Sequence, residues 1–362
     1  MKERSRVVRH RQTMKRQLAS RRNIPGRRRP KGPAARAPEP SLNAVWKSGH
    51  QAGRSAPEDR ALAAQHARLA WREHWQSISG NFGSYEAAMQ AGKAYMQGYE
   101  KSAGYPVDIV PLPLHHAAAA VGCAGNEERT LGKVMAQLKR LPLKDIIVVL
   151  NGTTDDSLNL VLAESDITLV YEPDRAGHDV GRALGAKMTE AEAILFVDGD
   201  MVLPAEQLAP FLYAVDRGSD VALNDLNSLL PPFARQDDVS RIKAYLNRTL
   251  GRPDLGANSL TAVPHALSRK MVLTVKPESL AVPPKAQAMA IRHGLSATAP
   301  CEVDVIRSNR LRTTNTGSGN EVAGLIIGDH LEAIAAWMAS AEHGPASRML
   351  SRAEVAYRRN AR

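Results

Sequence analysis

Two aspartates one residue apart, Asp198 and Asp200, follow the apolar run 193–197. Five consecutive apolar residues with β-branched and aromatic members are typical of a strand buried on both faces. In open α/β sheets, ligands bind where such strands end, and side chains two residues apart on extended backbone point to the same side. Two carboxylates in one place repel each other unless a cation joins them, and a divalent ion is the usual solution. The alternative is a solvated turn, because Asp and Gly are common turn residues.

Three other polar segments also follow predicted strands, and they cover residues 124–128, 151–156 and 172–182. The last of these leads into a helix whose backbone amides and two arginines are available for phosphate. The acidic pair in the first segment suits a helix N-terminus and needs no function. Each segment alone is a weak signal.

The elements that must position these segments alternate between strand and helix. Strands are predicted at 118–123, 145–150, 167–171, 193–197, 221–224 and 302–306, and the helices among them at 127–140, 177–189 and 205–217. Strands spaced by helices of this length imply βαβ units. The predicted fold class is therefore α/β, with a Rossmann-like, mostly parallel sheet flanked by helices.

In this order and spacing, the four polar segments resemble the family 2 glycosyltransferases of the GT-A fold, which use nucleotide-diphosphate sugars. The resemblance runs from about residue 117 to about residue 294. Asp198–Gly199–Asp200 matches the D-x-D element of that family, which implies Asp200 on a Mg²⁺ or Mn²⁺ ion and Asp198 toward the ribose or the metal. The other nucleotide-binding positions that the resemblance implies are Ala124, Asn126, Glu127, Asn151, Gly177 and Arg182.

Beyond the D-x-D element the match is thinner. Residues 255–269 resemble the acceptor-side segment of the family, which implies substrate contacts at Asn258 and Ser259. His265 is the preferred candidate for a further metal ligand, and His330 and Asp329 are alternatives for the metal or the diphosphate. A lone histidine, however, is more often structural.

Many inverting members carry Glu-Asp ahead of a helix, and the Asp is the general base. The equivalent region of this chain, 281–285, has no carboxylate. We prefer Asp225 as the replacement base because it follows a predicted strand of the same sheet. The other candidates have simpler explanations: Asp237 and Asp238 suit a helix start, and Glu278 lies beside a proline turn. A basic group after residue 306 could neutralise a leaving diphosphate or be a solvated loop, and it comprises Arg307, Asn309, Arg310 and Arg312.

The net charge of +11 is concentrated in a tail at residues 1–40, which hold 14 Lys and Arg against two Glu. The remaining residues are almost neutral, with 34 basic and 35 acidic side chains. Few large apolar groups in the tail predict disorder. We expect it to bind an anionic polymer or a membrane surface, or only to aid solubility. No aromatic residues are interleaved to stack bases, so specific nucleic-acid binding is not expected.

After this tail, the predicted organisation is a helical hairpin at 41–105, a linker at 106–116, a GT-A domain at 117–315 and C-terminal helices at 316–362. Two cysteines, Cys123 and Cys301, are too few for a disulfide framework. No apolar run has the length of a membrane span, and the N-terminus lacks the apolar stretch of a signal peptide. We therefore expect a cytoplasmic protein, which the tail would allow to associate peripherally with a membrane.

The resemblance implies an enzyme of the hexosyltransferase type. It would move a sugar from a UDP- or GDP-sugar to the hydroxyl of an acceptor that the sequence does not identify, with a divalent metal and inversion at the anomeric carbon. The alternative is a non-catalytic protein that binds a nucleotide sugar or a partner and has a degenerate base position. A third class, a nucleic-acid-binding protein, rests on the tail alone.

Overall fold

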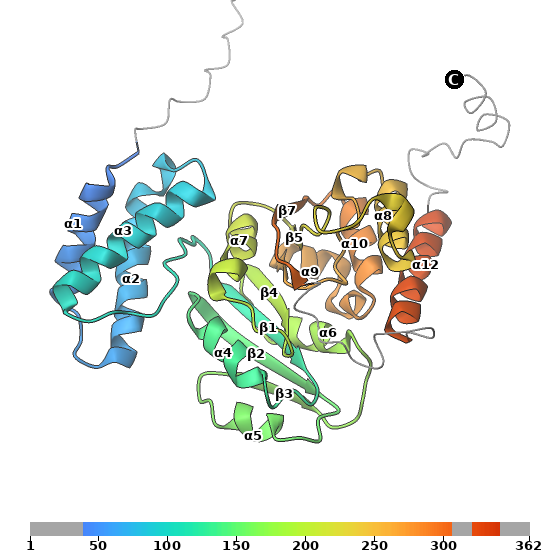
Figure 1. The fold of residues 1–362 in the computed structure, drawn as a ribbon, viewed down its shortest axis with the longest axis horizontal. Coiled ribbons are helices and arrows are strands. Elements are labelled where there is room, and N and C mark those ends of the chain that lie inside the picture. The colour runs from blue at the N-terminus through green and yellow to red at the C-terminus, as the bar shows by residue number, and fades with distance from the viewer. Residues whose placement is uncertain (1–38, 306–320, 341–362) are drawn as a thin grey trace, which may run out of the picture. The chain divides into compact units, whose positions relative to one another are not determined.

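The computed structural model describes residues 39–305 and 321–340, and their centre is one mixed seven-stranded sheet (Figure 1). The strand order is β3-β2-β1-β4-β6-β5-β7. The strands are β1 (Ala118–Ala124), β2 (Leu143–Asn151), β3 (Thr168–Glu172), β4 (Ala193–Asp198), β5 (Val221–Asn224), β6 (His265–Ser268) and β7 (Ala297–Cys301). The predicted fold class is confirmed.

Strand β6 is antiparallel to both of its neighbours, β4 and β5, while the other pairs of the sheet are parallel. Strands β1 to β5 and β7 therefore end at the same edge, and β6 begins there. We call this the carboxyl edge. Polar residues that follow these strands, or begin β6, are brought to one side of the sheet.

Helices cover both faces of the sheet. On one face lie α4 (Leu131–Lys139) and α7 (Ala205–Asp216), and on the other α6 (Val180–Ala186), α9 (Arg269–Val275) and α10 (Pro283–Arg292). The strands alternate accordingly, so that Leu195 packs in the first layer and Phe196 in the second. The remaining elements are α5 (Ser157–Leu162), α8 (Asp238–Thr249), α12 (Glu321–Ser340) and the 3₁₀ turns Ser79–Asn81, Phe233–Arg235, Pro253–Leu255 and Pro277–Ala281.

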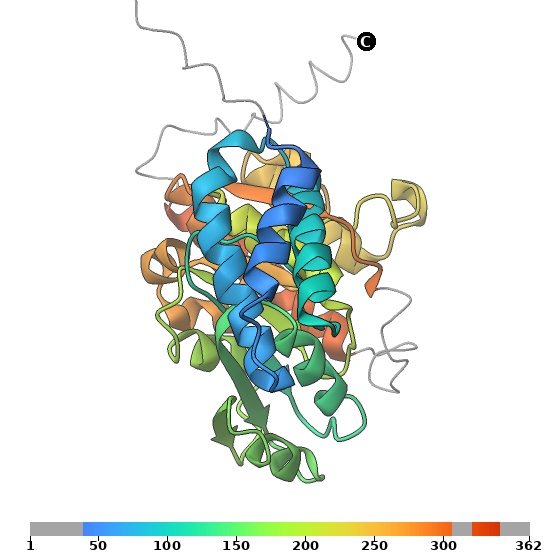
Figure 2. The same cartoon turned by 90° about the vertical axis from the view of Figure 1, so that its left-hand side faces the viewer.

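Three helices precede the sheet, where the sequence predicted a hairpin of two. They are α1 (Leu42–Gly53), α2 (Arg60–Ile78) and α3 (Tyr85–Ala103), and they lie side by side in Figure 2, coloured blue to cyan. The hydroxyl of Ser84 accepts from the backbone amide of Ala87, as predicted for the N-cap of α3, and Ser41 caps α1 in the same way. Pattern reasoning missed α1 because its buried positions are mostly glycines, which give no apolar periodicity.

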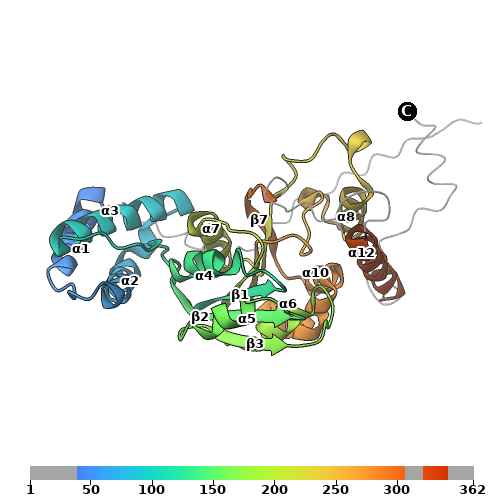
Figure 3. The same cartoon turned by 60° about the horizontal axis from the view of Figure 1, so that its bottom comes forward.

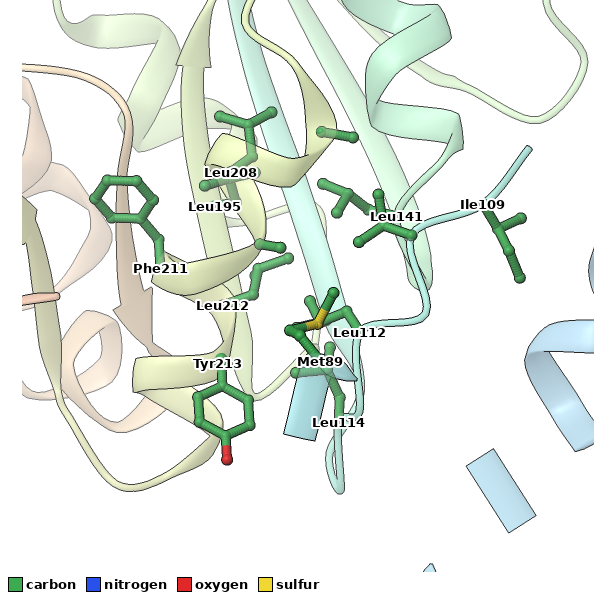
Figure 4. Close-up of a cluster of buried hydrophobic side chains, with 14 of the residues drawn as sticks. Met89, Ile109, Leu112, Leu114, Leu141, Leu195, Leu208, Phe211, Leu212 and Tyr213 are labelled. Atoms are coloured by element: carbon green, nitrogen blue, oxygen red, sulfur yellow. The ribbon is translucent and has the colours of Figure 1, made fainter. Parts of the chain in front are cut away.

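The three helices and the linker share a core with the sheet. Figure 4 shows Met89 of α3 and Leu112 and Leu114 of the linker beside residues of α7, and all belong to one buried cluster that also contains Leu195. The indole of Trp71 on α2 donates to the carbonyl of Pro111 at 3.0 Å. The linker is therefore packed between the helices and the sheet domain.

A substitution at Gly98 should destabilise this helical layer. A Cβ atom there would lie 2.1 Å from the carbonyl oxygen of Trp46 on α1, so Gly98→Ala forces two helix backbones apart. We expect a loss of about 1–3 kcal/mol of stability, the usual cost of overpacking. Gly132→Ala, at an exposed position of α4, is the matched control, because a Cβ there meets nothing within 4 Å. Thermal unfolding followed by circular dichroism checks both; equal midpoints for the two variants would contradict the close packing.

The sequence misplaced one strand and missed another. A strand was predicted at 302–306, but residues 302–304 are not a strand, and the strand of that region, β7, lies before them at Ala297–Cys301. The alternating apolar residues after Cys301 suggested a strand, but Val303 is instead held in a loop, where its amide donates to the side chain of Asn224 at 2.8 Å. Strand β6 was not predicted, because four residues give too short a pattern.

The expectation that no segment has the length of a membrane span was also wrong. Residues 321–339 of α12 form a helical stretch of 19 residues with a mean hydropathy of 1.4, long and apolar enough to cross a membrane. Only 11% of the apolar window is buried. Figure 3 shows α12 beside α8 and α10. The stretch contains three acidic residues, so the sequence shows no uninterrupted apolar run of this length.

Candidate functional site

The site lies at the point where the order in which strands join the sheet reverses. From β1 the chain adds β2 and β3 on one side, while β4 pairs with β1 on the other. In open α/β sheets ligands bind at such a point, so we expect the ligand crevice at the ends of β1 and β4 and use the word crevice for this position. Cys123 is the register partner of Asp198, and the amide of Gly199 donates to the carbonyl of Cys123 at 2.7 Å. A Cβ on Gly199 would lie 2.6 Å from that of Ala124. Glycine therefore lets the turn between the two aspartates lie against the end of β1.

Asp198 is part of a partly buried charge cluster. Its carboxylate lies 3.8 Å from the guanidinium of Arg182, which also pairs with Asp179 at 2.8 Å and donates to the carbonyl of Leu260 at 3.1 Å. Burial raises the pKa of Asp198; Arg182 opposes this shift and Asp200 adds to it. Negative charge at Asp198 is thus incompletely compensated by the protein, and a further cation would stabilise it. Asp179 was missed from the sequence, although an Asp–Arg pair three residues apart on one helix start is a readable signal.

His265 begins β6 at the same edge, opposite Phe196 of β4. The histidine is buried, stacks on the ring of Phe196 and contacts the carbonyl of Ala262 through Nδ1 at 2.9 Å. Burial, aided by the charge of Arg182, lowers its pKa to about 3, so the ring is neutral at physiological pH. Neutral imidazole is the form that binds metals. Within residues 39–305 and 321–340, however, no three acidic, histidine or cysteine side chains converge to hold a metal by themselves.

Two asparagines fasten the loops that follow β1 and β2. The side-chain oxygen of Asn126 accepts from the amides of Thr154 and Asp155, at 2.7 and 3.2 Å. Asn151 contacts the exposed loop that precedes α6: its oxygen accepts from the amide of Ala176 at 2.9 Å, and its amide donates to the carbonyl of Gly177 at 2.6 Å. Both residues were predicted as nucleotide ligands, and in the structure both hold the loops that border the crevice.

Asn151→Ala should therefore weaken nucleotide binding by releasing the loop of Ala176 and Gly177. Two hydrogen bonds are lost, each with a net value of about 1 kcal/mol, so we expect affinity for a nucleoside diphosphate to fall by about tenfold or more. Binding of Mn²⁺ alone should not change. Isothermal titration calorimetry measures both quantities. Wild-type nucleotide affinity in the variant would contradict this role.

Two other predicted nucleotide ligands differ in their access to solvent. Glu127 is 4% exposed, its backbone amide donates to the hydroxyl of Ser157, and Thr130 lies beside its carboxylate. Its side chain is thus part of the packing between the β1 and β2 loops. Gly177 is exposed and has a φ of 126°, a conformation that glycine adopts readily.

Asp225 follows β5 at the carboxyl edge, as the sequence predicted. One oxygen of its carboxylate accepts from the side-chain amides of Asn227 and Asn258, both at 3.0 Å, and from the backbone amide of Asn227 at 3.2 Å. Asn258 is buried, and its own oxygen accepts from the amide of Leu226. Asn258, predicted to bind substrate, therefore orients Asp225.

The acceptor-side segment, residues 255–269, contacts residues of three helices, α12, α10 and α6. Ser259 is buried and lies 3.4 Å from Nε2 of His330 on α12. The amide of Leu260 donates to the side-chain oxygen of Gln287 on α10, and its carbonyl accepts from Arg182. Gln287 was missed from the sequence; a polar residue among the buried alanines of α10 is the signal that could have found it.

The remaining candidate bases are accounted for by local structure. Asp237 caps α8 by accepting from the amide of Ser240 at 2.7 Å, and Asp238 pairs with Arg241. Glu278 is exposed and pairs with Lys187 at 2.5 Å.

Asp329 was predicted as an alternative for the metal or the diphosphate. Burial raises its pKa to about 6, with Asp179 and Glu332 adding to the shift. Four candidates lie outside the described residues: Arg307, Asn309, Arg310 and Arg312.

Comparison with known protein families gives one match, and it covers the part of the chain that contains this site. Residues 121–228 match the model described as "Glycosyl transferase family 2". This segment runs from within β1 to just past β5 and includes both site aspartates and Asp225. No curated protein matches the sequence.

Among solved structures, the chain is similar to glucosyl-3-phosphoglycerate synthase from Mycobacterium tuberculosis. The complex of that enzyme with Mn²⁺, UDP and phosphoglyceric acid is 19% identical, with 60% of this chain and 79% of that chain covered and a TM-score of 0.43. Its complex with Mn²⁺, UDP and glucosyl-3-phosphoglycerate gives 16% identity, 62% and 80% coverage and a TM-score of 0.45. Its complex with Mg²⁺ and UDP is 17% identical, with 60% of this chain and 79% of that chain covered and a TM-score of 0.43.

Proposed function

We propose that this protein transfers a sugar from a nucleotide-diphosphate sugar to an acceptor hydroxyl, because residues 121–228 match the model of glycosyl transferase family 2. The observation that carries the proposal is the grouping of Asp198, Asp200 and Arg182 in the crevice between the ends of β1 and β4. Carboxylates and an arginine together suit a diphosphate and its cation.

Asp200 and Asp198 would hold Mg²⁺ or Mn²⁺. Carboxylate oxygens are the ligands these ions prefer, and the raised pKa of Asp198 indicates a negative charge that a cation would stabilise. Such ions keep several positions for water and substrate phosphates, so two carboxylates suffice, with neutral His265 as a further candidate. When bound, the ion supplies Lewis-acid stabilisation of the leaving diphosphate.

The residues around this pair would bind and orient the donor. The exposed loop at residues 173–178, which Asn151 fastens, borders the crevice and offers backbone groups to the base and ribose of a UDP- or GDP-sugar. Arg182 would keep Asp198 oriented, because its guanidinium is fixed between Asp179 and the carbonyl of Leu260.

Asp225 would accept the proton of the attacking acceptor hydroxyl. Its place at the carboxyl edge and the amides that fix one of its oxygens are what a positioned base requires. Attack from the side opposite the leaving diphosphate would invert the anomeric carbon.

The second candidate function is non-catalytic binding of a nucleotide sugar. It is favoured by the start of α10, where Val282, Pro283 and Pro284 occupy the place of the Glu-Asp pair that inverting relatives use. Under this function, ligands would stabilise the protein but no sugar would be transferred.

A thermal-shift panel of nucleotide-diphosphate sugars, with and without Mn²⁺, tests the proposal. A ligand at a hundred times its dissociation constant stabilises the native state by about 2.7 kcal/mol. We expect one class of nucleotide sugar to raise the midpoint with Mn²⁺ present, and chromatography to detect release of the nucleoside diphosphate when acceptors are added. No shift from any nucleotide would refute the proposal; a shift without turnover on a broad acceptor panel would favour the binding protein.

A further inference from the structure

Helix α12 is apolar around most of its circumference, yet it lies largely in solvent. Leu325, Leu331 and Met338 are 45%, 54% and 47% exposed. A helix that is apolar all round is normally buried, and a contiguous exposed apolar surface marks an interaction site. We define the outer face of α12 as Leu325, Gly328, Leu331, Ala335 and Met338, all of them exposed.

The opposite side of α12 is fixed to the protein. His330 is fully buried against Ser259, and Ala333 packs in a cluster with Leu246 of α8 and Leu250, which follows that helix. The guanidinium of Arg292 on α10 lies 5.6 Å from the centre of the Trp337 ring. With this side engaged, the helix presents its outer face outward and is not free to enter a bilayer on all sides.

The sequence that flanks α12 favours an anionic lipid surface as the occupant of the outer face. Residues 321–340 contain no Lys or Arg, but the sequence on either side is basic: 306–320 hold three Arg and no acidic residue, and 341–362 hold five Arg against two Glu. The helix itself carries three acidic residues, Glu321, Asp329 and Glu332, against the eight arginines of the flanking sequence, and Glu332 is paired with Lys285 at 2.7 Å. Apolar side chains flanked by arginines match the acyl chains and negative head groups of a membrane surface.

We infer that the outer face of α12 docks in the plane of an anionic membrane surface and inserts Leu325, Leu331 and Met338 among the head groups. The protein is then held at the membrane without crossing it. This inference does not depend on the proposed glycosyl transfer, because none of the outer-face residues belongs to the site at the carboxyl edge.

Vesicle sedimentation of the full chain tests the docking, with phosphatidylcholine alone and with phosphatidylcholine containing 30% phosphatidylglycerol. The double variant Leu325→Glu/Leu331→Glu should partition into the anionic vesicles at least tenfold less than wild type. The control is Leu162→Glu/Leu273→Glu, two leucines on α5 and α9 that are more exposed than Leu325 and Leu331, and it should leave partition unchanged. The measurement is repeated in 0.5 M NaCl, where binding by the N-terminal tail is screened but apolar insertion persists. Equal partition of both double variants and wild type would overturn the inference.

Gly328→Leu distinguishes a lipid surface from a second copy of the chain. A Cβ on Gly328 meets nothing within 4 Å, so the protein tolerates the larger residue. On lipid, added apolar surface should keep or strengthen partition; against another helix it would block close approach. Sedimentation velocity showing a wild-type dimer that Gly328→Leu dissociates, with no binding to either vesicle, would overturn the inference in favour of self-association.

Discussion

Replacing Asp200 by alanine should abolish the metal dependence of nucleotide binding and lower turnover by about a thousandfold or more, because metal stabilisation of a leaving group supplies several kcal/mol. The two site aspartates lie at the end of β4, and Arg182 compensates the charge of Asp198 only in part. Without Asp200, the remaining carboxylate should not retain the ion. In calorimetric titrations, nucleoside diphosphate should therefore bind the variant equally in Mn²⁺ and in EDTA.

The matched control for Asp200→Ala is Asp166→Ala, which removes an exposed aspartate paired with Lys139. Glu164 pairs with the same lysine, so this change should cost no more than about 1 kcal/mol of stability and leave binding intact. A wild-type protein whose nucleotide affinity is the same in Mn²⁺ and in EDTA would refute the metal at this site, whatever the variant does.

Asp225→Asn should lower turnover by about a hundredfold to ten-thousandfold while nucleotide affinity stays within about twofold, because a positioned base contributes to the chemical step alone. The side-chain oxygen of asparagine can still accept from Asn227 and Asn258, so the loop should remain folded.

Asp238→Asn is the control, since Asp238 lies in the first turn of α8 and pairs with Arg241. Asn258→Ala provides a second test of the role of Asp225. If Asn258 acts by orienting Asp225, its effect on turnover should largely disappear in the Asp225→Asn background, so that the two changes are not additive. Full activity of Asp225→Asn on its acceptor would make Asp225 structural.

The sequence predicted the parallel part of the fold well because β1, β2 and β4 are runs of apolar residues buried on both faces. It placed Asp198, Asp200 and Asp225 at the correct edge, since strand ends follow directly from such runs. The second half of the sheet was harder. β6 and β7 are short, and what defines them is pairing with β4 and β5, which lie far away in sequence.

The roles of the polar side chains could be predicted less well. Asn126, Asn151 and Asn258 were predicted to contact ligands, and the sequence did not predict their hydrogen bonds to loops 25 to 33 residues away. Neither the periodicity nor the composition of a sequence indicates hydrogen-bond partners at such a separation. The same holds for Gln287, whose contact with Leu260 joins α10 to the acceptor-side segment.

The position of β6 between β4 and β5 has a consequence for biosynthesis. β5 ends at Asn224, but both strands that pair with it, β6 and β7, are made later, and β6 ends at Ser268. At ribosomal rates of about 5–20 residues per second, β5 waits about 2–9 s for the strand that joins it to β4, and the free edge of β4 waits longer. The first four strands can assemble during translation, whereas the edge that carries Asp225 can close only after His265 has left the ribosome. During that interval the nascent chain presents an open, apolar strand edge, the kind of surface to which chaperones bind and from which aggregation begins.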